Sequence, residues 1–215
     1  QLLFKPDKNT IEYKALEAAS DELHTTPQRL MLQVGGIASP KDLHMARFLF
    51  ENFPRGAGFP SLPVPSAPAS LPVADVAAFS IDDVTTTEID DAFSVRTLDD
   101  GNVVVGIHIA APGLGVKPDD AIDKMARSRM STVYMPGDKI TMLPDDIVNA
   151  FTLAEGKNCP AVSLYATLNP ADWTVLSTAT RAELVPIKSN LRHNDLDDLV
   201  NEETLASGEG EYPHK

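Results

Sequence analysis

The sequence predicts an α+β protein in which a small helical region at the N-terminus precedes a mostly antiparallel, β-rich domain. In the first 53 residues, apolar side chains recur at the spacing of one helix face. From residue 75 onward, most apolar runs are short and end at turn sequences. Strands and helices do not alternate regularly there, so a parallel sheet of repeated strand–helix–strand units is not expected.

Three short helices are expected in residues 1–53. The first covers residues 11–23, and the second and third begin at Pro27 and Pro40. Threonine or serine precedes each proline, which is typical of a capped helix start because the hydroxyl accepts a backbone N–H and proline fits the first turn. Such a trio is either a packing appendage or a helix-turn-helix that binds duplex DNA. The third helix carries no cluster of arginine and lysine, which disfavours DNA binding.

A proline-rich segment, residues 54–74, is predicted to be a linker. Six of the 17 prolines lie between Pro54 and Pro72, together with several glycines and serines. Such a composition sustains neither a helix nor a central strand. The segment also marks a change of charge. Residues 1–60 hold equal numbers of basic and acidic side chains, so the net charge of −13 belongs to residues 61–215.

Residues 75–215 are predicted to begin with strands at 75–81, 92–98 and 103–110. The sequence Asp-Asp-Gly-Asn between the last two is typical of a hairpin turn. A helix is predicted at 118–130, with aspartates near its start and arginines near its end, as the helix dipole favours. The other expected elements are strands at 131–137, around 139–144, at 161–168 and at 174–185, an acidic helix at 195–206 and a frayed tail at 208–215.

The composition excludes several classes of protein. The longest apolar stretch, Val103–Ala111, is far shorter than the ~20 residues that a membrane span needs, and the N-terminus does not have the pattern of a signal peptide. The single cysteine, Cys159, excludes an intrachain disulfide framework and a zinc site of several cysteines. A cytoplasmic location without membrane association is therefore expected. An acidic body repels nucleic acid unless cations intervene.

A cluster of five carboxylates stands out between residues 79 and 93, where no lysine or arginine occurs. Its members are Asp82, Asp83, Glu88, Asp90 and Asp91. Like charges so close together repel one another, and divalent cations would relieve the repulsion. Hard oxygen ligands suit Mg²⁺ or Mn²⁺, whereas the spacing does not suit a calcium loop, because the required glycine is absent. The alternative is an acidic, threonine-rich loop that binds nothing.

The cluster resembles the signature of the ribonuclease II (RNB) family, in which an aspartate is followed six residues later by a second acid and then by an Asp-Asp pair. Here Asp82, Glu88, Asp90 and Asp91 hold these places. Three further segments resemble family motifs and occur in the same order: VVVGIHIA, AIDKMARSRMSTVYMPG and ITMLPDDIVNAFTLAEG. The resemblance covers about residues 75–195.

The resemblance implies that residues 75–215 are the N-terminal part of an RNB-type catalytic domain. The family degrades single-stranded RNA from the 3′ end and releases nucleoside 5′-monophosphates by phosphodiester hydrolysis with two Mg²⁺ ions; Mn²⁺ is an alternative. By resemblance, Asp82, Glu88 and Asp90 are expected metal ligands, and Asp90 and Asp91 are expected catalytic residues. Glu88 stands where the family usually has aspartate, so its longer side chain changes the expected geometry.

The resemblance also suggests RNA-binding residues. Tyr134 matches a family aromatic that stacks on a base near the 3′ end, which suits a nonspecific nuclease because every base offers a stacking face. The alternative for Tyr134 is a core residue in a strand. Arg129 is expected either to contact a phosphate or to complete a helix. His193 stands where relatives commonly carry a tyrosine that holds the RNA end. A histidine could also stack, and the alternative is a surface histidine without a role.

The family's catalytic domain extends beyond the resembling region and is followed by an OB-fold domain. We therefore expect both as partners of this chain in a longer protein, and we expect the 215 residues alone to be an incomplete, largely inactive nuclease. Two alternatives differ in class. One is a non-catalytic RNB-like protein that binds RNA or acts as a scaffold. The other is a helix-turn-helix regulator, which the balanced charge of residues 1–60 disfavours.

Overall fold

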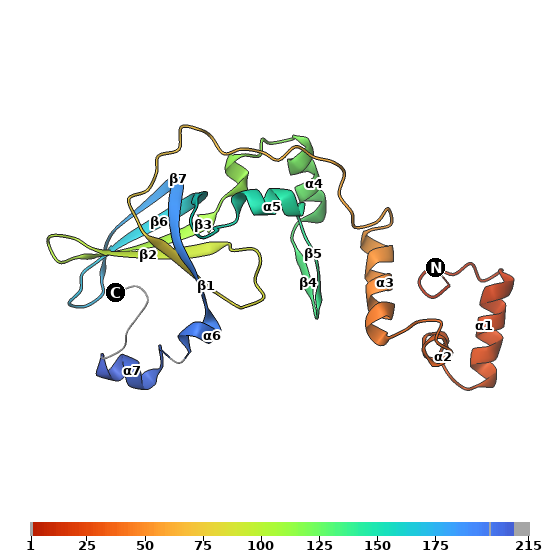
Figure 1. The fold of residues 1–215 in the computed structure, drawn as a ribbon. Coiled ribbons are helices and arrows are strands. Elements are labelled where there is room, and N and C mark those ends of the chain that lie inside the picture. The colour runs from red at the N-terminus through yellow and green to blue at the C-terminus, as the bar shows by residue number, and fades with distance from the viewer. Residues whose placement is uncertain (1, 198, 209–215) are drawn as a thin grey trace. The chain divides into compact units, whose positions relative to one another are not determined.

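A computed structural model describes residues 2–197 and 199–208 of the chain. The chain divides into two compact units, residues 1–60 and 61–215 (Figure 1). Within the described residues, no helix combines the length and the apolar composition needed to cross a membrane.

The first unit contains the three predicted helices. Thr26 Oγ1 accepts a hydrogen bond from the backbone N–H of Arg29 at 3.3 Å, and Ser39 Oγ accepts one from that of Asp42 at 3.1 Å. These caps stabilise helix starts by satisfying N–H groups that have no partner within the helix. The prediction is confirmed, with α1 (Ile11–Glu22), α2 (Pro27–Gln33) and α3 (Pro40–Asn52).

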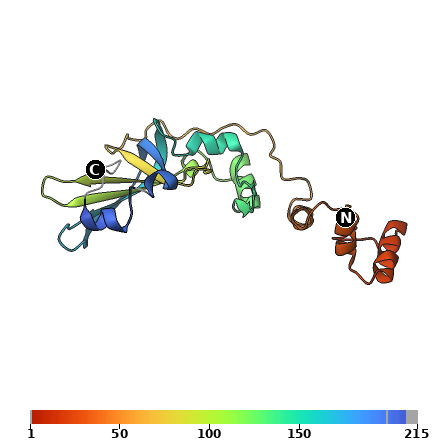
Figure 2. The same cartoon turned by 60° about the horizontal axis from the view of Figure 1, so that its bottom comes forward.

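The second unit is built on a closed five-stranded barrel, in the order β1-β2-β3-β6-β7 (Figures 1 and 2). Neighbouring strands are antiparallel except β1 and β7, which are parallel and close the barrel. The predicted α+β class with a mostly antiparallel sheet is confirmed. The strands are β1 (Ala78–Asp82), β2 (Asp91–Thr97), β3 (Val103–Ala110), β6 (Asn158–Leu168) and β7 (Val175–Arg192).

The last barrel strand is longer than predicted. The sequence predicts that this strand ends at Val185, before a proline, but β7 continues to Arg192. Pro186 is the last residue of β7 that pairs with β6, and Ile187 is the first that pairs with β1. Proline lacks the N–H that a central strand needs, so it is tolerated at this change of partner. The prediction was wrong because it treated Pro186 as the end of the strand.

The remaining elements include two corrections. The predicted helix at 118–130 is confirmed as α4. The strand predicted around 139–144 is shorter than expected, because β5 ends at Ile140 and helix α5 begins at Asp145. The prediction of a single acidic helix at 195–206 was wrong. Two short helices replace it, because Asn201 caps a new helix by accepting from the N–H groups of Glu203 and Thr204. These elements are η1 (Pro112–Leu114), α4 (Ala121–Arg129), β4 (Val133–Met135), β5 (Asp138–Ile140), α5 (Asp145–Phe151), α6 (His193–Leu196) and α7 (Glu202–Ser207).

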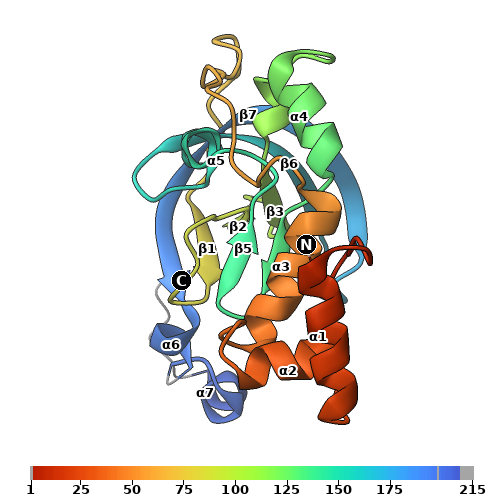
Figure 3. The same cartoon turned by 90° about the vertical axis from the view of Figure 1, so that its right-hand side faces the viewer.

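Helices α4 and α5 and the β4–β5 hairpin lie at one end of the barrel (Figures 1 and 3). Part of the predicted linker is packed on this unit. Leu62 and Ala67 contact the apolar core around α4 and α5, and Val73 forms a parallel bridge with Leu184 of β7. Of the predicted tail at 208–215, residues 209–215 lie outside the described part of the chain.

The barrel interior contains a polar cluster centred on His108, which is fully buried. Its Nε2 lies 2.9 Å from Ser94 Oγ, and its Nδ1 lies 2.8 Å from Ser163 Oγ. A Cβ at Gly106 would collide with Ser94 Oγ, so glycine makes room for these contacts. Burial lowers the pKa of His108 below its ordinary value, and the nearby Glu183 opposes this shift.

This lowered pKa predicts a pH dependence of stability. As the pH falls below 6.5, the ordinary pKa of histidine, the unfolded chain takes up a proton before folded His108 does. The free energy of unfolding should therefore fall by up to ~1.4 kcal/mol per pH unit in this window, and the effect should vanish above it. Urea unfolding at pH 7.5 and 5.5 measures the change. His108→Gln should reduce this dependence, and an unchanged pH dependence in that variant would contradict the assignment.

Candidate active site

The acidic segment is anchored at Ile89, the residue between Glu88 and Asp90. Ile89 is buried, and its backbone N–H donates to Thr152 Oγ1 at 2.7 Å. Its carbonyl accepts from the backbone N–H of Leu153 at 2.9 Å and from the Thr152 hydroxyl at 3.3 Å. These contacts link the acidic segment to the chain just after α5. They fix the backbone from which the two carboxylates extend.

Asp82 is held separately, at the end of β1. Its Oδ2 accepts a hydrogen bond from Ser80 Oγ at 2.6 Å. Ser80 Oγ in turn accepts from Asn190 Nδ2 at 2.9 Å, and the same amide donates to the carbonyl of Leu153 at 3.0 Å. A chain of hydrogen bonds therefore orients Asp82 from β7, the parallel neighbour of β1.

Two cationic side chains contact the acidic segment. Arg192, the last residue of β7, donates from Nη1 to the carbonyls of Asp83 at 2.9 Å and Thr86 at 3.4 Å. Lys139 of β5 forms an ion pair with the Glu88 carboxylate. Arg192 therefore stabilises the backbone of the loop, whereas Lys139 neutralises one of the predicted metal ligands.

The predicted carboxylates share one electrostatic environment. The pKa of Asp90 is raised above its ordinary value, first because partial burial disfavours the charged form and then because Glu88, Asp91 and Asp82 are negatively charged. Lys139 acts in the opposite direction. The charges of Glu88, Asp91 and Asp82 thus all act on Asp90.

The donor chemistry of this cluster fits a hard divalent cation, but the arrangement is incomplete as a metal site. Among residues 2–197 and 199–208, no three side chains of histidine, cysteine, aspartate or glutamate gather closely enough to hold a metal ion. Glu88 is engaged by Lys139. Metal binding by Asp82, Glu88 and Asp90 therefore stays a prediction.

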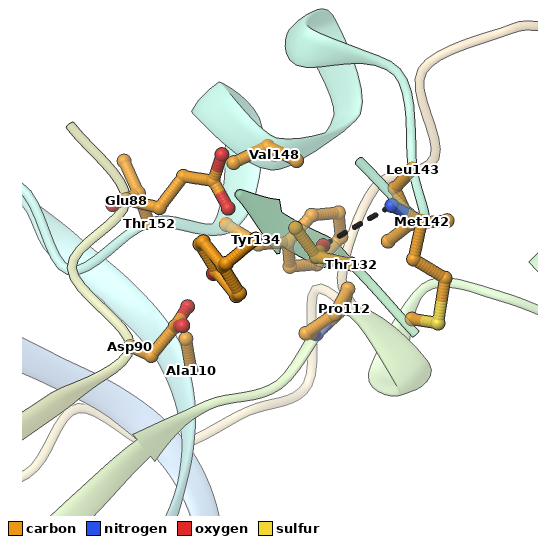
Figure 4. A pocket seen from close by; sticks show the side chains of 11 residues that line it. Glu88, Asp90, Ala110, Pro112, Thr132, Tyr134, Met142, Leu143, Val148 and Thr152 are labelled. Atoms are coloured by element: carbon orange, nitrogen blue, oxygen red, sulfur yellow. Dashed lines mark hydrogen bonds between the residues drawn. The ribbon is translucent and has the colours of Figure 1, made fainter. Parts of the chain in front are cut away.

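A pocket of about 160 Å³ joins the acids to the predicted RNA-stacking residue. Glu88 and Asp90 lie on one side, and Tyr134 of β4 shares the opening (Figure 4). The remaining wall is largely apolar and includes Pro112, Leu143, Val148 and Phe151. Tyr134 is 70% exposed, so it is a surface side chain and not a core residue.

The other predicted RNA-binding residues do not line this pocket. Arg129 donates from Nη1 to the carbonyl of Thr141 at 3.0 Å, which ties α4 to the end of the β4–β5 hairpin. Burial lowers the pKa of its guanidinium below the ordinary value. His193 is exposed at the first position of α6. RNA contacts by these two residues stay predictions.

Sequence analysis missed the residues that support the site. Thr152, Asn190 and Lys139 lie 63, 110 and 51 positions from the partners described above, and such contacts leave no local pattern. One signal was available. The segment Met-Pro-Gly-Asp at 135–138 is typical of a turn, which would place Lys139 opposite Tyr134, as the strand register does.

Comparisons with known proteins identify the family of the chain. A family model described as "RNB domain" matches residues 72–211. An uncharacterized ribonuclease of Synechocystis is 32% identical over 140 residues, a match that covers 63% of this chain and 20% of the relative.

Two solved structures share the fold. Mycoplasma genitalium RNase R in complex with ribose-methylated single-stranded RNA has a TM-score of 0.57 at 19% identity, covering 69% of this chain and 22% of that one. A yeast pseudonuclease has a TM-score of 0.65 at 21% identity, covering 76% and 22%. The match thus spans about a fifth of the length of each of these three proteins.

Proposed function

The chain belongs to the RNB domain family, and from this premise we propose that it supplies the acidic part of a 3′-to-5′ exoribonuclease. The proposed substrate is single-stranded RNA, and the proposed products are nucleoside 5′-monophosphates. The observation that carries this proposal is the pocket in which Glu88 and Asp90 meet the exposed ring of Tyr134. Acidic groups that bind a hydrolytic cation and an aromatic that holds a base are the two parts that nonspecific RNA cleavage needs.

Asp82, Glu88 and Asp90 are proposed to hold Mg²⁺, with Mn²⁺ as the alternative. Two features support this: the hard oxygen donors, and the pKa of Asp90, which is raised first by burial and then by the negative charges of Glu88, Asp91 and Asp82. When bound, a divalent cation would supply positive charge that attracts the phosphodiester and activates water. Asp91, exposed at the start of β2, is proposed as the catalytic carboxylate together with Asp90.

Tyr134 is proposed to hold the 3′-terminal region of RNA by stacking, which contributes ~1–3 kcal/mol per base without base specificity. The negative charge of residues 61–215 opposes RNA binding. Basic surface outside the 215 residues would offset this repulsion, and the matched Synechocystis ribonuclease is about five times as long as the aligned part. We therefore propose that the 215 residues alone hydrolyse RNA poorly.

A trimming assay tests the proposed function. Single-stranded RNA labelled at its 5′ end is incubated with Mg²⁺ and either the 215-residue chain or the polypeptide encoded by the complete reading frame. The complete polypeptide should shorten the RNA from the 3′ end and release nucleoside 5′-monophosphates, whereas the 215 residues should leave most of it intact. Internal cuts, 3′-phosphorylated products or rapid trimming by the 215 residues would contradict the proposal.

A second candidate is a non-catalytic RNB-like protein that binds RNA. The observation that favours it is the Lys139–Glu88 ion pair, together with the absence of a three-ligand group among the described residues. Such a protein would bind single-stranded RNA but would release no mononucleotides at any Mg²⁺ concentration.

A further inference from the structure

The β4–β5 hairpin places a lysine at the acidic segment. Lys139 stands opposite Tyr134 in the register of the hairpin. Its Nζ pairs with Glu88 and lies 3.4 Å from Thr87 Oγ1, to which it donates. This contact joins the element that carries the exposed aromatic ring to the segment that carries the carboxylates.

The ion pair is more than a surface contact. The side chain of Glu88 is 15% exposed and that of Lys139 is 37% exposed, so solvent screens their attraction less than it screens a fully exposed pair. The ammonium thus offsets the charge of the Glu88 carboxylate in the absence of any metal.

We propose that Lys139 is a tethered cation that competes with a divalent metal ion for Glu88. The inference rests on the proposed function, because it concerns the same acidic site. In the ion-paired state, Glu88 cannot offer its full charge to a metal, because the ammonium offsets that charge. A metal ion that binds Glu88 must displace the ammonium, so occupancy by one cation weakens the other.

The competition couples the metal site to the aromatic residue. When a metal ion takes Glu88, the hairpin loses its ion pair with the acidic segment. The ammonium then becomes available to a phosphate group in the hollow that Glu88, Tyr134 and Lys139 line together. Lys139 is thus a positioning residue for Glu88 and for the hairpin.

Titration of the 215-residue chain with Mn²⁺, followed by calorimetry, tests the proposal. Lys139→Met removes the competing charge and should raise the affinity for Mn²⁺ about tenfold, since one unit charge in contact with a partly buried ligand is removed. Lys139→Arg keeps the charge and should bind like the wild type. Lys124→Met is the matched control: it removes the same charge from an exposed position of α4, whereas the ion pair of Glu88 is made by Lys139.

Hydrogen exchange of residues 133–140 supplies a second readout. Saturating Mn²⁺ should speed amide exchange in the wild-type hairpin, because the metal removes its ion pair, and should have little effect in Lys139→Met. Equal Mn²⁺ affinities of the wild type, Lys139→Met and Lys124→Met would overturn the competition while leaving the metal site intact. If even Lys139→Met bound no Mn²⁺, both the competition and the proposed metal site would fail.

Discussion

Asp91→Asn should lower the rate of mononucleotide release by about 10²- to 10⁴-fold, the range expected when a carboxylate that takes part in proton transfer is lost. Asparagine has nearly the same shape, so the strand that begins at Asp91 should keep its pairing with Ile109 of β3. The exposed carboxylate contributes to the repulsion at Asp90, and its removal should also ease that repulsion. The rate is measured with the polypeptide encoded by the complete reading frame, on labelled single-stranded RNA with Mg²⁺.

The control for this experiment is Asp99→Asn. Asp99 is also exposed, but it lies in the turn between β2 and β3, so its loss should leave the rate within about twofold of the wild type, as for ordinary surface substitutions. If Asp91→Asn hydrolysed RNA as fast as Asp99→Asn, the catalytic assignment of Asp91 would be wrong.

Leu153→Ala should lower the free energy of unfolding by ~2–5 kcal/mol, the usual cost of removing a fully buried leucine side chain. Leu153 has no exposed surface and belongs to the barrel core. Its backbone contacts Ile89 on one side and the Asn190 amide on the other, so the cavity would open directly beneath the acidic segment. Urea unfolding monitored by circular dichroism gives the change.

Leu164→Ala provides the comparison, because Leu164 is 41% exposed on β6 and should lose much less apolar contact. Comparable losses of stability in the two variants would contradict the placement of Leu153 in the core. The Leu153 variant should also lose metal or RNA binding at lower urea concentrations than the Leu164 variant, since the core supports the site.

Local signals explain which parts of the fold could be predicted. The helix starts at Pro27 and Pro40 carry capping residues immediately before them. The strand at 103–110 is predicted with its full bounds, because an apolar run follows a strong turn signal. The prediction of an element fails where the contact that decides its bounds joins residues far apart in the sequence. The continuation of β7 past Pro186 depends on pairing with β1, which the sequence around Pro186 cannot reveal.

The candidate site shows the same division. The acidic residues are visible in sequence because five fall within ten positions, and the structure brings Glu88 and Asp90 to the pocket of Tyr134. The Lys139–Glu88 pair was not predicted. A lysine in a short two-stranded hairpin is usually a solvated residue, and only the tertiary fold brings Lys139 to Glu88. The sequence therefore predicts which acidic residues belong to the site, but not the side chains that contact them.

The parallel pairing of β1 with β7 has a consequence for the order of folding. Contacts across this seam, such as Asn190 to Ser80, join residues 110 positions apart. A large entropic cost of loop closure precedes their formation, and proteins dominated by such distant pairings fold on millisecond-to-second timescales. A ribosome-bound chain that lacks β7 cannot close the barrel or orient Asp82. The acidic centre can therefore be completed only after β7 has been synthesised.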